Sequence, residues 1–200
     1  MTNNIPFRES HPSRTCTTQY TDHKRFKPHL RVDFNQRCGY CHANDIYLGG
    51  ATVFHVDHFA PQKKFPDLRL NYSNLVYSCP YCNRSKSDDW PSTDATQNIA
   101  NDKGYIDPCG EEYVNNFCRD PQGNIVPLSP VGIYMHKRLR FGLRRHQILW
   151  IIHQIRVTMN ELHSELEKKP ADYALLTQLA SLNKEYLQYW DYITDNKANA

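Results

Sequence analysis

The stretch Phe54-His-Val-Asp-His58 and, further along the 200-residue chain, the stretch Cys79-Pro-Tyr-Cys-Asn-Arg-Ser-Lys86 carry most of the information about the fold. Residues 51–58 are rich in β-branched and aromatic residues, which favours a strand. Residues 74–78, Asn-Leu-Val-Tyr-Ser, favour a second short strand. A polar segment from Asn83 onward favours a helix. The order strand, strand, helix predicts a small core of mixed α and β structure in this part of the chain.

Four of the seven cysteines stand in two C-x-x-C pairs, Cys38-Gly-Tyr-Cys41 and Cys79-Pro-Tyr-Cys82. Two thiolates at this spacing can occupy two corners of a tetrahedron, so the two pairs together predict a structural Zn²⁺ site. The alternative, four unrelated core cysteines, requires the same spacing twice by chance. Cys16, Cys109 and Cys118 lack this spacing, and we expect them to be buried free thiols.

The composition, with 40% hydrophobic and 22% charged residues, is that of an ordinary soluble globular protein. No run of about 18 uncharged apolar residues is present, and residues 1–10 lack the apolar stretch of a signal peptide. We therefore expect a cytoplasmic protein without a membrane contact. The net charge of +3 is only mildly basic and does not by itself indicate a nucleic-acid-binding protein.

Local charge is more informative than net charge. Basic residues gather in two clusters, which are Lys24, Arg25, Lys27 and Arg31, and Lys137, Arg138, Arg140, Arg144 and Arg145. Either cluster could lie along a phosphate backbone. Each is equally well explained as the solvated face of a helix.

The chain divides into three expected parts. Residues 1–28 are polar and irregular, residues 29–128 carry the motifs described above, and residues 129–200 are expected to be helical. Asp120-Pro-Gln-Gly-Asn124 separates two short strands of a predicted hairpin. Ser129-Pro130 marks the start of a helix, with the serine as its cap.

Residues 148–166 and 175–193 each carry apolar residues at alternating steps of four and three, as amphipathic helices do. Pro170 separates the two segments, so the two helices should form an antiparallel hairpin. This hairpin is either a packing unit for the preceding domain or an arm that binds a partner or forms a dimer.

The residues at the end of the first predicted strand and after the second suit phosphodiester hydrolysis, which requires a deprotonated water and a cation that holds the charge developing on the phosphate oxygens. His58 suits the first task because an imidazole accepts a proton near neutral pH. Asp57 and Asn83 offer hard oxygen ligands that suit Mg²⁺. Adjacent strand residues point to opposite faces, so we expect a break at His58 that lets Asp57 and His58 act on one phosphate.

The pattern Asp57-His58, then Asn74, then Cys82-Asn-Arg-Ser-Lys86 resembles the ββα-metal, or His-Asn-His (HNH), endonuclease family. The resemblance implies that His58 activates the attacking water and that Asn74 orients His58 through the backbone. It also implies that Asp57 and Asn83 hold a catalytic Mg²⁺ or Mn²⁺ ion.

The resemblance covers about residues 36–91. The two cysteine pairs resemble the zinc ribbon of many members, and Arg84 and Lys86 resemble phosphate-contacting positions. Many members carry an acidic residue where this sequence has His55. His55 is therefore expected to be a further metal ligand or a residue that donates a hydrogen bond to a metal ligand. The implied fold is α+β, with a small ββα-metal nuclease core and zinc knuckles followed by a C-terminal α-helical hairpin.

Two classes of function follow from these residues. The first is a metal-dependent endonuclease that nicks DNA or breaks both strands. The second is a zinc-ribbon nucleic-acid-binding subunit without its own cleavage activity, in which Asp57, His58, Asn74 and Asn83 would be a relic. Small nucleases resembling this chain, including those of Septu-, retron- and Zorya-type anti-phage systems, often act as effector subunits. The resemblance thus implies a role in prokaryotic defence, with an ATPase or sensor subunit bound through the C-terminal helices.

Overall fold

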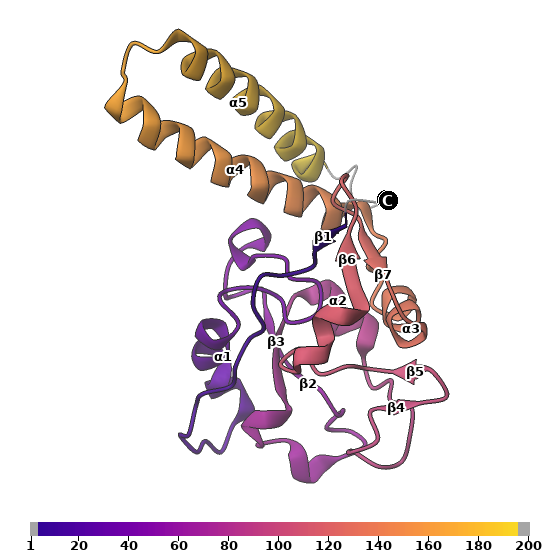
Figure 1. Ribbon diagram of the computed structural model, residues 1–200. Coiled ribbons are helices and arrows are strands. Elements are labelled where there is room, and N and C mark those ends of the chain that lie inside the picture. The colour runs from indigo at the N-terminus through magenta and orange to yellow at the C-terminus, as the bar shows by residue number, and fades with distance from the viewer. Residues whose placement is uncertain (1–3, 196–200) are drawn as a thin grey trace. The chain divides into compact units, whose positions relative to one another are not determined.

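The computed structural model describes residues 4–195 and is shown in Figure 1. Contacts within the chain divide it into two compact units, Met1–Gly142 and Leu143–Ala200. The division falls later than the boundary after residue 128 that the sequence suggested. The reason is helix α3, Pro130–Arg138, which packs against two strands of the first unit.

A short antiparallel hairpin followed by a helix lies at the centre of the first unit. Strand β2, His55–His58, pairs in regular register with strand β3, Leu75–Ser78. Helix α2, Pro80–Lys86, follows β3 directly. The predicted order strand, strand, helix is confirmed, and the fold class is α+β with a cysteine cluster and C-terminal helices, as expected.

β3 and α2 form where the sequence supplies apolar side chains and a helix cap. All four residues of β3 are buried, in line with its β-branched and aromatic composition. The Cys79 sulfur caps α2 by accepting a hydrogen bond from the Cys82 N–H, and Pro80 takes the first helical position. Because of this cap, α2 begins earlier than Asn83, where the polar segment had suggested a start.

β2 is shorter than the sequence suggested. Residues 51–53 continue the turn begun by Gly49-Gly50, where both glycines have positive φ angles of 93° and 74°. Pairing with β3 stays regular through His58, and the Phe59 N–H still donates to the Asn74 carbonyl. The predicted break at His58 is therefore wrong, because the ladder of hydrogen bonds to β3 holds the backbone extended up to this residue.

The first unit also contains a three-stranded sheet of order β1-β6-β7. β1, Ile5–Pro6, comes from the segment that the sequence suggested to be irregular. β6, Phe117–Arg119, and β7, Ile125–Pro127, form the predicted hairpin. The Ser129 side chain accepts a hydrogen bond from an N–H of the first turn of α3, which confirms the predicted cap.

The remaining elements of the first unit are short. β4, Ile99–Ala100, pairs with β5, Lys103–Gly104, and α3 packs on β5 and β7. The 3₁₀ helix η1, His23–Phe26, continues into helix α1, Lys27–Asp33. The other 3₁₀ helices are η2 (Asp45–Leu48), η3 (Pro66–Leu68), η4 (Tyr72–Asn74) and η5 (Glu111–Asn116).

The second unit is the predicted helical hairpin. Helix α4, Arg144–Lys168, packs against helix α5, Tyr173–Thr194, and the chain reverses between them near Pro170 (Figure 1). The Asp172 side chain caps α5 by accepting from two N–H groups of its first turn. No helix in residues 4–195 is long and apolar enough to cross a membrane.

Candidate active site

The four cysteines of the two C-x-x-C pairs form one buried cluster. Their sulfur atoms all lie within 4.8 Å of one another, and Cys41 Sγ is 3.8 Å from Cys79 Sγ. Zn–S bonds of about 2.3 Å in a tetrahedron place the sulfurs about 3.8 Å apart. The cluster could therefore bind zinc. Of the other cysteines, Cys118 is buried as expected, whereas Cys16 and Cys109 are only half-buried.

Two buried arginines lie beside the first cysteine pair. Arg8 donates a hydrogen bond of 2.7 Å to the Gly39 carbonyl, and Arg119 donates one of 3.4 Å to the Cys41 carbonyl. Burial lowers the pKa of Arg119 to about 10, so this guanidinium is still charged at neutral pH. Four thiolates around one Zn²⁺ ion leave a net charge of minus two, which these two cations would offset.

The first cysteine pair also positions Asp57. The hydroxyl of Tyr40 donates a hydrogen bond of 2.6 Å to Oδ2 of Asp57, and Tyr40 itself is held by Tyr113, whose hydroxyl donates to the Tyr40 carbonyl. Burial raises the pKa of Asp57, and Lys86, whose Nζ is 3.5 Å from Oδ2, opposes that shift. Both contacts lie at Oδ2, so they fix the carboxylate without occupying Oδ1.

Asn83 is positioned by the second cysteine pair, since it directly follows Cys82 in α2 and is half-buried. The next residue, Arg84, is exposed. His55 is also exposed, at the first position of β2.

Lys86 lies one helical turn after Asn83 and is fully buried. Its Nζ donates a hydrogen bond of 2.8 Å to the His58 carbonyl, besides its contact with Asp57. Burial lowers the pKa of Lys86, and Asp57 opposes that shift. The resemblance implied a phosphate contact for Lys86, but in this structure its ammonium group lies inside the domain and ties α2 to the end of β2.

His58 is held by a backbone carbonyl. Its Nε2 lies 3.0 Å from the carbonyl oxygen of Arg69. A carbonyl oxygen only accepts, so Nε2 carries the proton and the neutral ring keeps its lone pair on Nδ1. Burial lowers the pKa of His58, and the hydrogen bond to Arg69 opposes that shift. The imidazole is thus neutral at pH 7 with Nδ1 as its proton acceptor.

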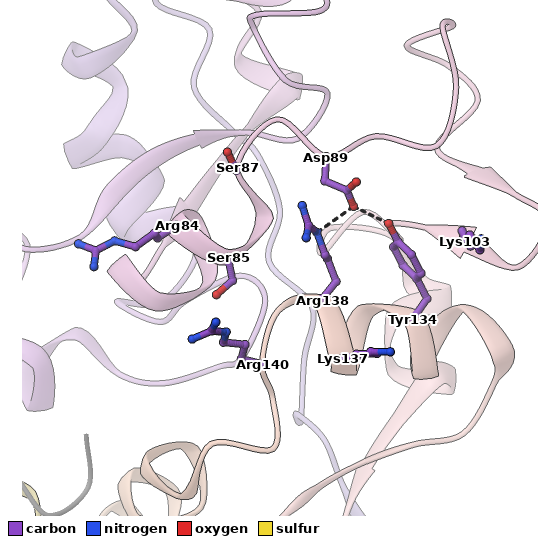
Figure 2. A pocket seen from close by; sticks show the side chains of 9 residues that line it. All are labelled: Arg84, Ser85, Ser87, Asp89, Lys103, Tyr134, Lys137, Arg138 and Arg140. Atoms are coloured by element: carbon purple, nitrogen blue, oxygen red, sulfur yellow. Dashed lines mark hydrogen bonds and ion pairs between the residues drawn. The ribbon is translucent and has the colours of Figure 1, made fainter. Parts of the chain in front are cut away.

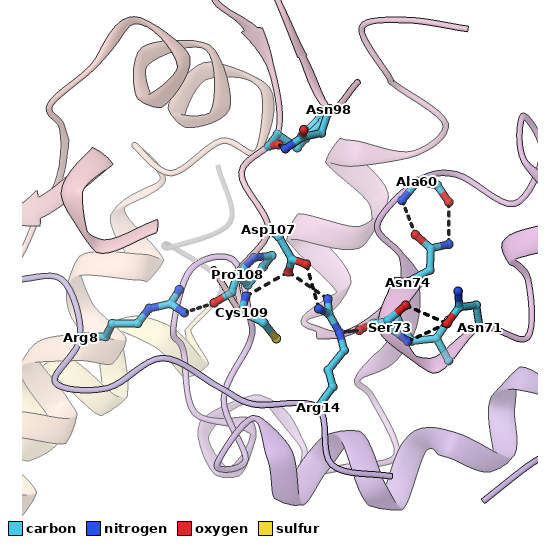
Figure 3. A network of polar contacts seen from close by, with 12 residues as sticks. Arg8, Arg14, Ala60, Asn71, Ser73, Asn74, Asn98, Asp107, Pro108 and Cys109 are labelled. Atoms are coloured by element: carbon cyan, nitrogen blue, oxygen red, sulfur yellow. Dashed lines mark hydrogen bonds and ion pairs between the residues drawn. The ribbon is translucent and has the colours of Figure 1, made fainter. Parts of the chain in front are cut away.

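Asn74 closes the loop between β2 and β3. Its side chain accepts a hydrogen bond from the Ala60 N–H and donates one to the Ala60 carbonyl, at 2.8 and 3.0 Å, as Figure 3 shows. It also donates to the carbonyl of Leu68, next to Arg69. The resemblance implied that Asn74 orients His58 through the backbone, and these contacts provide a physical route by which the Arg69 carbonyl is held against His58.

Sequence reasoning missed three contributors to this site: His23, Tyr40 and the Arg69 carbonyl. The ring of His23 lies 4.9 Å from that of His58, measured between centroids, and it comes from the segment expected to be irregular. Nothing in its spacing links it to the motif. Tyr40 could have been found, because it lies inside a C-x-x-C pair and is therefore fixed in place by any metal bound there.

Residues 38–89 match the model of the HNH endonuclease family. This segment is an HNH domain. A curated relative, the Septu protein PtuB of Bacillus mycoides (strain KBAB4), is 27% identical to the chain over 122 residues. The match covers 54% of this chain and 40% of the relative, so the chain spans less than two thirds of that protein. No solved structure matches.

The HNH domain comprises β2, β3 and α2 with both cysteine pairs, and it contains every candidate site residue that the sequence indicated. His23 lies outside the matched segment and is contributed by the preceding 3₁₀ helix. The HNH domain thus carries a carboxylate and a neutral imidazole on β2 and an amide on α2. This set of groups is suited to hydrolysis that uses a hard cation.

Proposed function

We propose that the chain is a metal-dependent endonuclease that hydrolyses phosphodiester bonds of DNA through its HNH domain. The observation that carries this proposal is the state of His58. Its Nε2 is held by the Arg69 carbonyl, which makes Nδ1 the acceptor of a buried, neutral imidazole. Such a group is suited to take the proton from water at neutral pH.

Asp57 and Asn83 would hold the catalytic Mg²⁺ or Mn²⁺ ion. His55 would be a further ligand or would donate a hydrogen bond to a ligand. The donor set fits such a cation, because both residues supply oxygen atoms and Tyr40 and Lys86 contact Asp57 at Oδ2. When bound, the cation stabilises negative charge on the phosphate oxygens. The four cysteines would hold a structural Zn²⁺ ion.

The residues of the chain then have distinct tasks in hydrolysis. His58 Nδ1 takes a proton from water, whose oxygen forms a bond to phosphorus while the bond to the leaving oxygen breaks. Asn74 keeps His58 in place through the loop backbone. Arg84, exposed beside Asn83, contacts a phosphate of the substrate. Lys86 positions Asp57 and the end of β2 from inside the domain.

We further propose that this nuclease is the cytoplasmic effector of a prokaryotic defence system. The support is the similarity to a protein named Septu protein PtuB, since Septu is one of the anti-phage system types whose nucleases the sequence resembles. The surface offered to an ATPase or sensor subunit would be α5, where Tyr173, Leu176 and Leu187 are exposed.

The alternative is a DNA-binding subunit that does not cleave. Supercoiled plasmid incubated with the purified protein in Mg²⁺, Mn²⁺ or EDTA, beside a His58→Ala variant, separates the two functions. The proposal expects nicked or linear DNA only with the metal ions and only from the parent protein. Binding without cleavage under every metal condition would support the alternative.

A further inference from the structure

A basic pocket opens in the first unit between α2, β5 and α3 (Figure 2). Its volume is about 750 Å³, which is in the range of ligand-binding cavities. The residues that line it are Arg84, Ser85, Ser87, Asp89, Lys103, Tyr134, Lys137, Arg138 and Arg140. We call it the α2–α3 pocket.

The charge of the α2–α3 pocket is strongly unbalanced, with five basic side chains against one carboxylate, Asp89. That carboxylate already accepts hydrogen bonds from the hydroxyls of Tyr105 and Tyr134, and it pairs with Arg138 at 3.2 Å. Figure 2 shows the Arg138 and Tyr134 side chains converging on it. The negative charge of Asp89 is therefore already compensated by groups of the protein itself.

The other four basic side chains, those of Arg84, Lys103, Lys137 and Arg140, are exposed. Within residues 4–195, no carboxylate forms an ion pair with any of them. Like charges gathered around one cavity repel one another, and a polyanion relieves that repulsion while it releases its own counterions. The pocket is thus suited to a ligand that carries several negative charges.

The α2–α3 pocket begins beside the candidate active site. Arg84 on its wall directly follows Asn83, the candidate metal ligand, in α2. The other three of these cations come from β5, α3 and the turn after α3, all outside the HNH domain at residues 38–89. A strand whose phosphate lies at Asn83 would therefore meet further cations as it continues past α2.

We propose that the α2–α3 pocket binds the phosphodiester backbone of the substrate strand next to the bond that is cut. This inference rests on the proposed nuclease function. The cations come from three separate elements and surround a volume larger than a single phosphate requires, which favours consecutive phosphates of a strand over one free anion. Contacts of this kind hold the register of a strand without reading its sequence.

The test compares a Lys137→Gln/Arg140→Gln variant with a Lys168→Gln/Lys169→Gln control, both in a His58→Ala background that prevents cleavage. Each variant removes two exposed positive charges, and neither pair includes the Arg138 that holds Asp89. Affinity for a labelled DNA duplex of arbitrary sequence is measured against salt concentration. Equal melting temperatures and zinc contents establish that the variants are folded.

We expect the pocket variant to lower the slope of log affinity against log salt by about 2, close to one for each phosphate that the protein no longer neutralises. The control should keep the slope of the His58→Ala protein. An unchanged slope in the pocket variant overturns the proposal. If the wild-type chain still cuts plasmid in a His58-dependent way in that case, the proposed function stands and only the pocket inference fails.

Two further titrations distinguish a nucleic-acid strand from a free phosphate-containing anion as the ligand of the pocket. Inorganic phosphate and ATP are titrated against both proteins while the melting temperature is followed. Stabilisation of the parent but not of the pocket variant, together with equal DNA affinity of the two, would identify a site for a free anion and overturn the proposal. A lowered salt slope without cleavage by the wild-type chain would support the pocket and count against the nuclease.

Discussion

At the scale of single residues, the site depends on side chains that act through others. His58 takes its orientation from a carbonyl, and that carbonyl is held by a loop that Asn74 closes. Asp57 takes its orientation from the hydroxyl of Tyr40. The candidate residues of the motif could be predicted from the sequence because their spacing is characteristic, and their roles stay predictions. Tyr40 could be placed beside the cysteine cluster because it lies inside a C-x-x-C pair. Its contact with Asp57, and that of the Arg69 carbonyl with His58, arise only once the chain is folded.

Replacing Asn74 should impair the base without affecting metal binding. Asn74→Ala removes the two hydrogen bonds to Ala60, so the loop no longer holds the Arg69 carbonyl against His58. We expect cleavage to slow by about 10- to 100-fold, as for groups that orient catalytic residues elsewhere. The single-turnover rate at saturating Mn²⁺ measures this. Asn71→Ala is the control, because it removes the hydrogen bonds that the Asn71 side chain accepts from Ser73 in the same loop. This variant should cleave faster than Asn74→Ala.

Replacing Tyr40 should weaken metal binding. Tyr40→Phe leaves Asp57 without its 2.6 Å hydrogen bond, and we expect the apparent affinity for Mn²⁺ to fall by about 10-fold. Calorimetric titration with Mn²⁺ gives the value. Tyr77→Phe removes a similar hydrogen bond, to Asp45, and serves as the matched control. Equal Mn²⁺ affinity in both variants would show that Asp57 needs no support from Tyr40.

At the scale of elements, α2 joins the two candidate metal sites. It is capped by Cys79 of the cysteine cluster, carries Asn83 and ends with Lys86 against β2. The order of β2, β3 and α2 could be predicted because alternation, composition and turn residues are local signals. The start of α2 and the length of β2 could not, because they depend on the sulfur cap of Cys79 and on the glycine turn before β2.

Removal of the Lys86 charge should destabilise the first unit. Lys86→Met leaves the buried Asp57 carboxylate without its cation and the His58 carbonyl without its donor. Loss of one partner of a buried pair costs roughly 3–5 kcal/mol. Urea denaturation measures the change. Lys63→Met, which breaks the exposed pair with Asp88, should have little effect, and equal stability losses in the two variants would refute the structural role given to Lys86.

Loss of a cysteine ligand should unfold the region around α2. Cys79→Ser removes a candidate zinc ligand while the serine hydroxyl can still cap α2, and metal sites of this kind supply much of the folding free energy of small domains. We expect the purified variant to lack zinc and to lose the cooperative thermal transition of the first unit. Cys16→Ser, outside the cluster, should keep both properties. Retention of one zinc ion per chain by Cys79→Ser would contradict the assignment.

At the scale of the whole molecule, the chain consists of an HNH domain within a larger first unit and a separate helical hairpin. The hairpin was predictable because two amphipathic repeats flank a proline. The boundary between the two units could not be predicted. Ser129-Pro130 marks the start of α3 but carries no information on what α3 packs against. Part of the α2–α3 pocket could be predicted, because Lys137, Arg138 and Arg140 form a basic cluster in the sequence. That Arg84 and Lys103 line the same pocket could not be predicted, because the fold brings them there.

The roles of His58 and Asn83 in cleavage are tested by the single-turnover rate of DNA cleavage as a function of Mn²⁺ concentration, for the parent, His58→Ala and Asn83→Ala. For His58→Ala, we expect a maximal rate at least about 100-fold lower, because the base is lost, with an unchanged apparent Mn²⁺ affinity. For Asn83→Ala, we expect an apparent Mn²⁺ affinity at least about 10-fold weaker, because a ligand is lost. A His58→Ala protein that cleaves at the parent's maximal rate would show that His58 is not the base.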